Sequence, residues 1–130
     1  MDNSFLPLKD RSFLKSKGFT YREINDGVQK GIIIDNFSIH PEGKFSSNSA
    51  SLLILLPNGY PDVAPDMFYF IPALRLINTG SLPAQADQIL TFHGATWQRW
   101  SRHGPPDAWR PGTDGLQSYL QRVFNALNAA

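Results

Sequence analysis

The chain has 130 residues, of which 42% are hydrophobic and 18% are charged, so it can bury a core and does not have the composition of a disordered chain. This length predicts a single domain over residues 1–130. The formal net charge of +1 argues against a dedicated nucleic-acid-binding protein, which usually carries a basic domain or stripe. The absence of cysteine excludes disulfide bonds, thiolate zinc sites and any reaction that needs a cysteine nucleophile.

The first residues lack the basic-then-apolar order of a signal peptide. The longest apolar run, Leu52 to Leu56, is far shorter than the ~20 residues that a membrane-spanning helix needs. Since missing cysteine also fits a reducing compartment, we expect a cytoplasmic protein without a membrane partner.

The first half of the chain predicts one helix followed by strands. Residues 8–17 form a short helix between Pro7 and Gly18. Four segments rich in β-branched and apolar residues follow as strands, at residues 21–25, 29–39, 45–56 and 67–71. Because hairpin-type turns join successive strands, these segments predict an antiparallel meander.

Residues 72–91 carry the weakest pattern, from which we expect an extra strand at 73–77 and a short helix at 84–90. The segment from Phe92 to Pro111 holds all three tryptophans and two of the three histidines. It has too many glycines and prolines for one long helix, and therefore predicts a long ordered loop across one face of the domain.

The last element is an amphipathic helix. Apolar residues from Leu116 to Leu127 follow i, i+3, i+4, i+7 spacing, with Thr113 or Asp114 as the N-cap. Helices combined with an antiparallel meander place the chain in the α+β class.

Two short motifs give this order of elements a family resemblance. Tyr60-Pro61 and Pro65 lie between the third and fourth strands, and Trp109-Arg110-Pro111 precedes the last helix. In these features the chain resembles the ubiquitin-conjugating (E2) proteins. The resemblance implies the UBC-like fold, with an N-terminal helix, a four-stranded antiparallel meander, a long active-site loop and a C-terminal helix.

The spacing within the tryptophan-rich segment extends the resemblance. In typical E2 proteins the catalytic cysteine lies eight positions before that tryptophan, and Ser101 occupies this place here. The Asn of the family's His-Pro-Asn motif corresponds to His93, but Thr91 and Phe92 replace the rest of the motif. The run W-Q-R-W-S-R-H further resembles the divergent bacterial E2-like proteins of prokaryotic E2 family E. Those proteins are linked to E1-like activating enzymes, ubiquitin-like proteins and deconjugating peptidases.

The resemblance implies that Ser101 accepts an activated ubiquitin-like C-terminus as an oxyester and passes it to an acceptor. No cofactor is expected on this chain, because the E1-like enzyme uses the ATP. An unassisted serine is a weak nucleophile at neutral pH and needs a base. His103, two residues further on, or His93 could act as that base or donate a hydrogen bond to the oxyanion.

Other interpretations of the same residues stay open. Ser101 could be a loop hydroxyl bonded to the backbone, in a non-catalytic E2 variant that positions a ubiquitin-like protein or an E1-like enzyme. A stand-alone hydrolase built on Ser101, His103 and Asp107 would turn over small esters, but the chain has no G-x-S-x-G motif. The spacing of His93 and His103 is poor for zinc, so no metal site is expected.

Two kinds of candidate binding residue, arginine and tryptophan, lie around this serine. Arg99 and Arg102 could hold a carboxylate or an acidic tail, or could simply be solvated surface charges. The indoles of Trp97, Trp100 and Trp109 could form a local core that fixes the segment, or a platform for a partner's extended tail.

Overall fold

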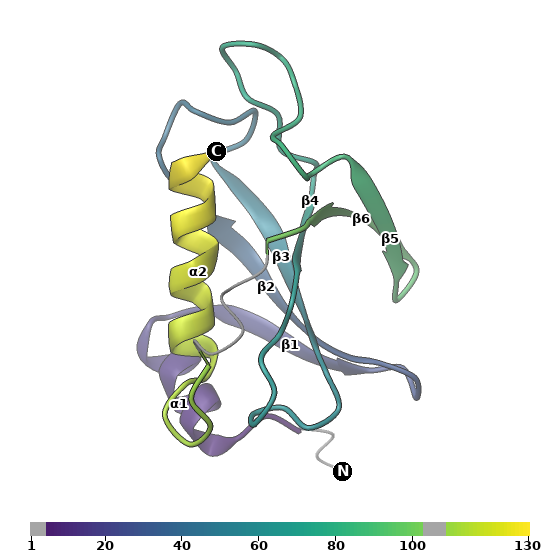
Figure 1. Cartoon of the computed structure of the whole chain (residues 1–130), viewed down its shortest axis with the longest axis vertical. Helices are drawn as coiled ribbons and strands as arrows, with labels where there is room; N and C mark the ends of the chain where they lie inside the picture. Colours follow the sequence, from purple (N-terminus) through teal and green to yellow (C-terminus); the bar gives the residue numbers. More distant parts are fainter. Residues whose placement is uncertain (1–4, 103–108) are drawn as a thin grey trace.

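The computed structural model describes residues 5–102 and 109–130, which fold into two helices and one sheet (Figure 1). The helices are α1 (Leu8–Ser16) and α2 (Leu116–Ala129). The strands are β1 (Thr20–Asn25), β2 (Lys30–Ser38), β3 (Ser49–Leu56), β4 (Phe68–Ile71), β5 (Gln88–Phe92) and β6 (Ala95–Trp100). Among the described residues all neighbouring strands are antiparallel, in the order β1-β2-β3-β4-β6-β5. The α+β class is therefore confirmed, with six strands instead of the four expected.

The first four strands form the predicted meander. Hairpin turns rich in glycine, such as Asp26-Gly27, join apolar strands whose side chains alternate between the two faces of the sheet. β3 begins later than expected, because residues 45–48 precede it outside the ladder and Phe45 makes only an isolated bridge with Leu76. This bridge is all that the structure retains of the extra strand expected at residues 73–77.

The expectation for residues 84–100 was wrong. Residues 88–92 form a strand where a helix was expected, and residues 95–100 form a strand where a long loop was expected. His93 and Gly94 join the two strands in a two-residue turn with φ angles of 50° and 77°, which is the type I′ geometry of tight hairpins. The aromatic and β-branched residues on both sides of this turn favour strands, and their strand preference outweighs the helical spacing.

Each face of the sheet buries its own cluster of apolar side chains. α2 packs on one face with its predicted apolar side, and α1 lies at its base (Figure 1). The other face carries a smaller cluster, formed by Ile33, Leu53, Tyr69, Phe92 and Trp97.

The smaller cluster depends on a close approach between strands that are not neighbours in the sheet. A Cβ atom at Gly31 would lie 2.9 Å from Cδ1 of Leu53 and 3.0 Å from Cζ of Phe92, so a larger residue would force these side chains to shift. Glycine at this position of β2 therefore lets the end of β5 reach across the sheet. The β5–β6 hairpin consequently curls over the face opposite the helices.

A buried carboxylate joins the two helices. Gly115 is the N-cap of α2 instead of the expected Thr113 or Asp114. Asp10 of α1 is 2% exposed, and its Oδ1 accepts the N–H of Leu116 (3.1 Å) at the positive end of α2. Its Oδ2 accepts the hydroxyl of Tyr60 (2.6 Å). Burial raises the pKa of Tyr60, and the hydrogen bond to Asp10 raises it further.

Candidate functional site

Ser101 directly follows β6, at the point where the chain leaves the sheet. Its backbone N–H donates a hydrogen bond to the carbonyl of Gln85 (2.9 Å), and the residue is half-buried. Phe68 lies opposite Trp100 at the end of the β4–β6 ladder, so the ladder stops one residue before Ser101. The segment before β5 therefore holds the backbone of this serine through the carbonyl of Gln85.

The residue before the serine is anchored in the main core. Trp100 is 0% exposed and stacks on Phe68, with ring centroids 5.7 Å apart and an angle of 24° between the planes. The rings of Phe45 and Phe70 meet its edge at 6.0 and 5.9 Å. Such pairs add about 0.5–1.5 kcal/mol each beyond the burial of area. The end of β6 is therefore one of the most firmly packed parts of the sheet.

A single buried amide fixes the segment that contacts Ser101. Gln98 is 4% exposed, and its Oε1 accepts the N–H of Leu74 (2.8 Å) and the indole N–H of Trp100 (3.0 Å). Its Nε2 donates to the carbonyls of Leu74 and Ala86, both at 3.1 Å. The oxygen and the nitrogen of the side-chain amide thus each take part in two hydrogen bonds. These bonds connect the segment before β5 to β6, which ends directly before Ser101.

Sequence reasoning missed Gln98 because it treated residues 92–111 as a loop. In a strand, residues two apart share a face, so Gln98 lies on the same face as Trp100. A lone polar side chain beside a core tryptophan would have indicated a buried hydrogen-bonding role.

The two arginines near Ser101 make different contacts. The guanidinium of Arg102 lies 5.0 Å from the ring centroid of Trp100, and its Nη1 donates to the carbonyl of Ser101 (3.3 Å). Burial lowers the pKa of Arg102. Arg99 lies opposite Tyr69 in the ladder, where burial raises the pKa of that phenol and the charge of Arg99 opposes the rise. The Nε atom of Arg99 is buried and has no hydrogen-bond partner among the described residues.

Trp109 anchors the start of the second described segment, residues 109–130. Its indole N–H donates to the carbonyl of Pro61 (2.9 Å), and its ring lies 6.4 Å from that of Tyr60. The guanidinium of Arg122 on α2 lies 5.7 Å from the same ring. Trp109 therefore links the segment between β3 and β4 to the last helix.

Of the three tryptophans, only Trp109 keeps solvent-exposed surface. Trp97 is 3% exposed and Trp100 is 0% exposed, and the indole N–H of Trp97 donates to the carbonyl of Phe92 (3.3 Å). Trp100 belongs to the larger core cluster and Trp97 to the smaller one, which fits the interpretation as a local core.

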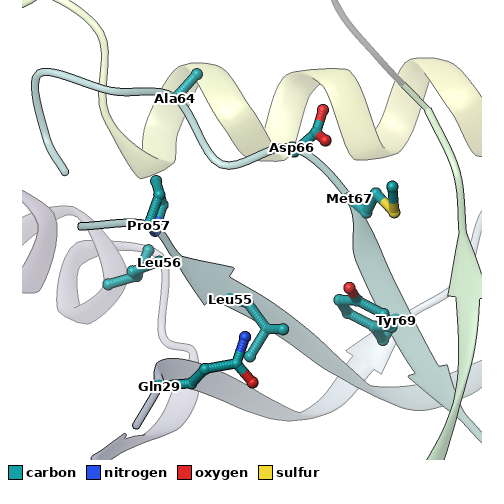
Figure 2. A pocket seen from close by; sticks show the side chains of 8 residues that line it. All are labelled: Gln29, Leu55, Leu56, Pro57, Ala64, Asp66, Met67 and Tyr69. Carbon is teal, nitrogen blue, oxygen red and sulfur yellow. The ribbon is translucent and has the colours of Figure 1, made fainter. Parts of the chain in front are cut away.

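A cavity of about 230 Å³ lies beside the start of β4 (Figure 2). Its walls come from the ends of β3 and β4 and from the segment between these strands. They are formed by Gln29, Leu55, Leu56, Pro57, Ala64, Asp66, Met67 and Tyr69. The cavity is mostly apolar, and Ser101 is not one of the residues that line it.

The family model for prokaryotic E2 family E matches residues 6–130. The chain belongs to this family. No curated protein and no solved structure matches the chain. Membership implies a role in ubiquitin-like conjugation and interactions with E1-like enzymes and ubiquitin-like proteins in general.

In this E2-like protein, the structure does not bring His93 to Ser101. His93 is exposed in the turn before β6, and the six residues of this strand, rising about 3.4 Å each, separate it from Ser101 by roughly 20 Å. Its charge instead adds to the backbone hydrogen bonds from Gln29 and Val28 that lower the pKa of Asp26. His103, the other expected partner of the serine, lies outside the described residues, as does Asp107.

Residues 5–102 and 109–130 contain no group of three or more His, Asp or Glu side chains that could hold a metal ion. Neither helix of this part of the E2-like protein is long and apolar enough to cross a membrane.

Proposed function

We propose that this E2-like protein accepts an activated ubiquitin-like C-terminus on Ser101 and passes it to an acceptor. The observation that carries the proposal is the place of Ser101 in a member of the E2 family. It directly follows β6 and lies eight positions before Trp109, where the family resemblance places a catalytic cysteine. The firm packing of Trp100 and the amide of Gln98 support a preorganised position for this hydroxyl.

The transfer is an acyl exchange. A bond forms between Oγ of Ser101 and the carbonyl carbon of the C-terminal residue, while the bond from that carbon to the thiol sulfur of the E1-like enzyme breaks. The sulfur leaves as a thiol after it takes up the hydroxyl proton, which a base must carry. A later attack by an amine or hydroxyl of the acceptor releases Ser101 again.

The second candidate is a non-catalytic E2 variant that binds and positions a ubiquitin-like protein or an E1-like enzyme. The distance between His93 and Ser101 favours it, because this imidazole cannot take the proton. His40, in the turn between β2 and β3, lies at the opposite end of the sheet from Ser101. Of the three histidines, only His103 is left as a candidate base for the acyl-transfer proposal, and a partner could supply a base instead.

An oxyester intermediate separates the two candidates. The protein is incubated with ATP, an E1-like enzyme and the ubiquitin-like protein that this enzyme activates, and covalent adducts are measured by intact mass. We expect an adduct that survives thiol reductant and is released by hydroxylamine. Ser101→Ala should abolish it, while Ser81→Ala, a change at an exposed serine between β4 and β5, should keep it.

Ser101→Cys adds a second readout. If Ser101 is the acceptor, the cysteine variant should form a thioester that reductant removes. Binding of either partner without an adduct on the wild-type protein would reject acyl transfer and support the non-catalytic variant.

A further inference from the structure

β5 is the outermost strand of the sheet and pairs only with β6 in the part of the chain that the structure describes (Figure 1). It lies away from both helices, and its five residues include neither a charge nor a proline. Gln88, Ile89 and Thr91 are exposed, and the side chain of Ile89 is 69% exposed. Proteins usually protect such an edge with charges, prolines or covering segments.

The hairpin turn determines which backbone groups of this edge are open. A two-residue turn makes Phe92 and Ala95 a hydrogen-bonded pair, and such pairs alternate along an antiparallel ladder. The groups of Leu90 and Gln88 therefore point toward β6, while the N–H and C=O groups of Ile89 and Thr91 point outward. These outward groups have no backbone partner within the described residues.

A cavity lies beside this open edge. Its volume is about 230 Å³, and Ile89 forms part of its rim. Most of the wall residues are apolar, namely Ile71, Pro72, Ala73, Leu82, Ala86, Ile89 and Trp97. The polar ones are Arg75, Asp87, Gln88, Thr96 and Gln98. An edge with two open residues and an adjacent apolar cavity is the combination that recognises an extended peptide by strand addition.

We propose that β5 binds an extended peptide segment of another protein, which adds to the sheet as a seventh strand and places an apolar side chain in this cavity. The outward groups of Ile89 and Thr91 select the extended backbone, and the apolar walls select the side chain. The edge begins three residues after Gln85, whose carbonyl holds the N–H of Ser101, so the peptide would lie next to the segment that positions this serine. The inference goes beyond acyl transfer, because binding needs no reaction at Ser101.

A peptide fits this edge better than a second copy of the chain. Pairing of two five-residue edges would use the open groups of only two residues on each side. Such a contact falls well below the roughly 1,000 Å² of buried area that a stable interface between folded proteins needs. A flexible peptide instead pairs with β5 and places a side chain in the cavity, and it needs only a few residues to do both.

The test uses the full chain and a fluorescein-labelled peptide of seven alternating valines and threonines, with binding measured by fluorescence anisotropy. A peptide of the same sequence with every amide N-methylated is the control, because it keeps the side chains and cannot donate hydrogen bonds. We expect at least tenfold weaker binding of the methylated peptide, which is the effect of losing about two net hydrogen bonds.

Two variants locate the site. Ile89→Pro removes the outward N–H and leaves the ladder with β6 intact, since Ile89 does not donate to β6. Ile89→Lys keeps the N–H and adds a charge beside the cavity. Both should weaken binding at least tenfold, whereas Val28→Lys, at a 90% exposed residue of the β1–β2 turn, should leave it within twofold. Ser101→Ala should bind like the wild type, which separates this proposal from acyl transfer.

Amide hydrogen exchange provides the decisive readout. Peptide binding should slow the exchange of the Ile89 and Thr91 amides at least tenfold, while the Leu90 amide is already protected by β6. Equal binding of the methylated peptide would overturn the proposal. Protection of the same two amides by self-association, as the protein concentration rises without peptide, would also overturn it and identify a second copy as the occupant.

Discussion

The two edges of the sheet differ in how they are protected. β1 carries Arg22 and Glu23, and Oε1 of Glu23 accepts the backbone N–H groups of Phe5 (2.7 Å) and Leu6 (2.9 Å). Oε2 of the same carboxylate lies 3.4 Å from Nε of Arg11 on α1. β5 has no charge of its own and receives no comparable contact from the described residues.

The two edges therefore differ in how much their polar groups contribute to folding. The β1 edge is integrated into the N-terminal segment and the first helix, so its polar groups contribute to folding. The β5 side is held from within, through Gln98 and the aromatic contacts of Trp100, and its outer edge is left open. An uncovered edge strand offers its unpaired backbone groups to another chain.

The largest effect is expected at the internal support of the β5 side. Gln98→Leu removes the partners of the Leu74 N–H and C=O groups, the Ala86 carbonyl and the Trp100 indole, all of them buried. Each unsatisfied buried group costs about 1–3 kcal/mol, and partial relaxation makes about 4 kcal/mol a reasonable total. Urea unfolding should show this loss in the free energy of unfolding.

The matched control for this change is Gln88→Leu on the exposed outer strand. It should alter the free energy of unfolding by less than about 0.5 kcal/mol, since surface substitutions rarely do more. A loss below about 1 kcal/mol for Gln98→Leu would show that water replaces the amide, and the contrast between internal support and open edge would then fail.

A smaller effect is expected where the other edge is covered. Glu23→Ala removes the acceptor of two backbone N–H groups and the partner of Arg11, and should lower the free energy of unfolding by about 2 kcal/mol. The amides of Phe5 and Leu6 should then exchange faster. Arg22→Ala is the control, because its pair with Asp35 is largely solvent-exposed and should contribute less than about 1 kcal/mol. Unchanged exchange at Phe5 and Leu6 would mean that Glu23 does not hold the covering segment.

Local sequence patterns determined the first half of the fold and the last helix. Apolar strands between glycine-rich turns predicted the meander, and helical spacing predicted the buried side of α2. The cap of that helix was missed because Asp10, more than a hundred residues earlier in the chain, accepts the N–H of Leu116. Such a long-range contact has no local signature.

The candidate site was predicted less completely. The position of Ser101 was predicted from its spacing to Trp109, and the structure shows that β6 ends directly before it. The distance of His93 from Ser101 and the burial of Gln98 were not predicted, because residues 95–100 form a strand. This strand separates His93 from Ser101 by its whole length and places the side chain of Gln98 in the core. The dipeptide His93-Gly94 was the overlooked signal, since glycine after a residue that tolerates positive φ is typical of a tight hairpin turn.

The smallest expected effect is a difference in pH dependence between the two sides. The helix junction includes a titratable pair, Tyr60 and Asp10, whereas the Gln98 amide does not titrate. Because folding raises the pKa of Tyr60, its contribution to stability is fully present below the unfolded value of about 10 and is lost as the pH rises above it. The loss attributable to this group should be of the order of 1 kcal/mol at pH 11.

Tyr60→Phe tests this sign directly. The variant is less stable than the wild type at pH 7, because the hydroxyl bond to Asp10 is gone, but its free energy of unfolding should fall less steeply between pH 9 and pH 11. Asp10→Asn should flatten the slope only in part, since burial is the larger cause of the raised pKa of Tyr60 and remains. Gln98→Leu should keep the wild-type slope while lowering the whole curve. Equal slopes for the wild type and Tyr60→Phe would show that alkaline unfolding starts elsewhere, and that the helix junction is no more sensitive to pH than the β5 side.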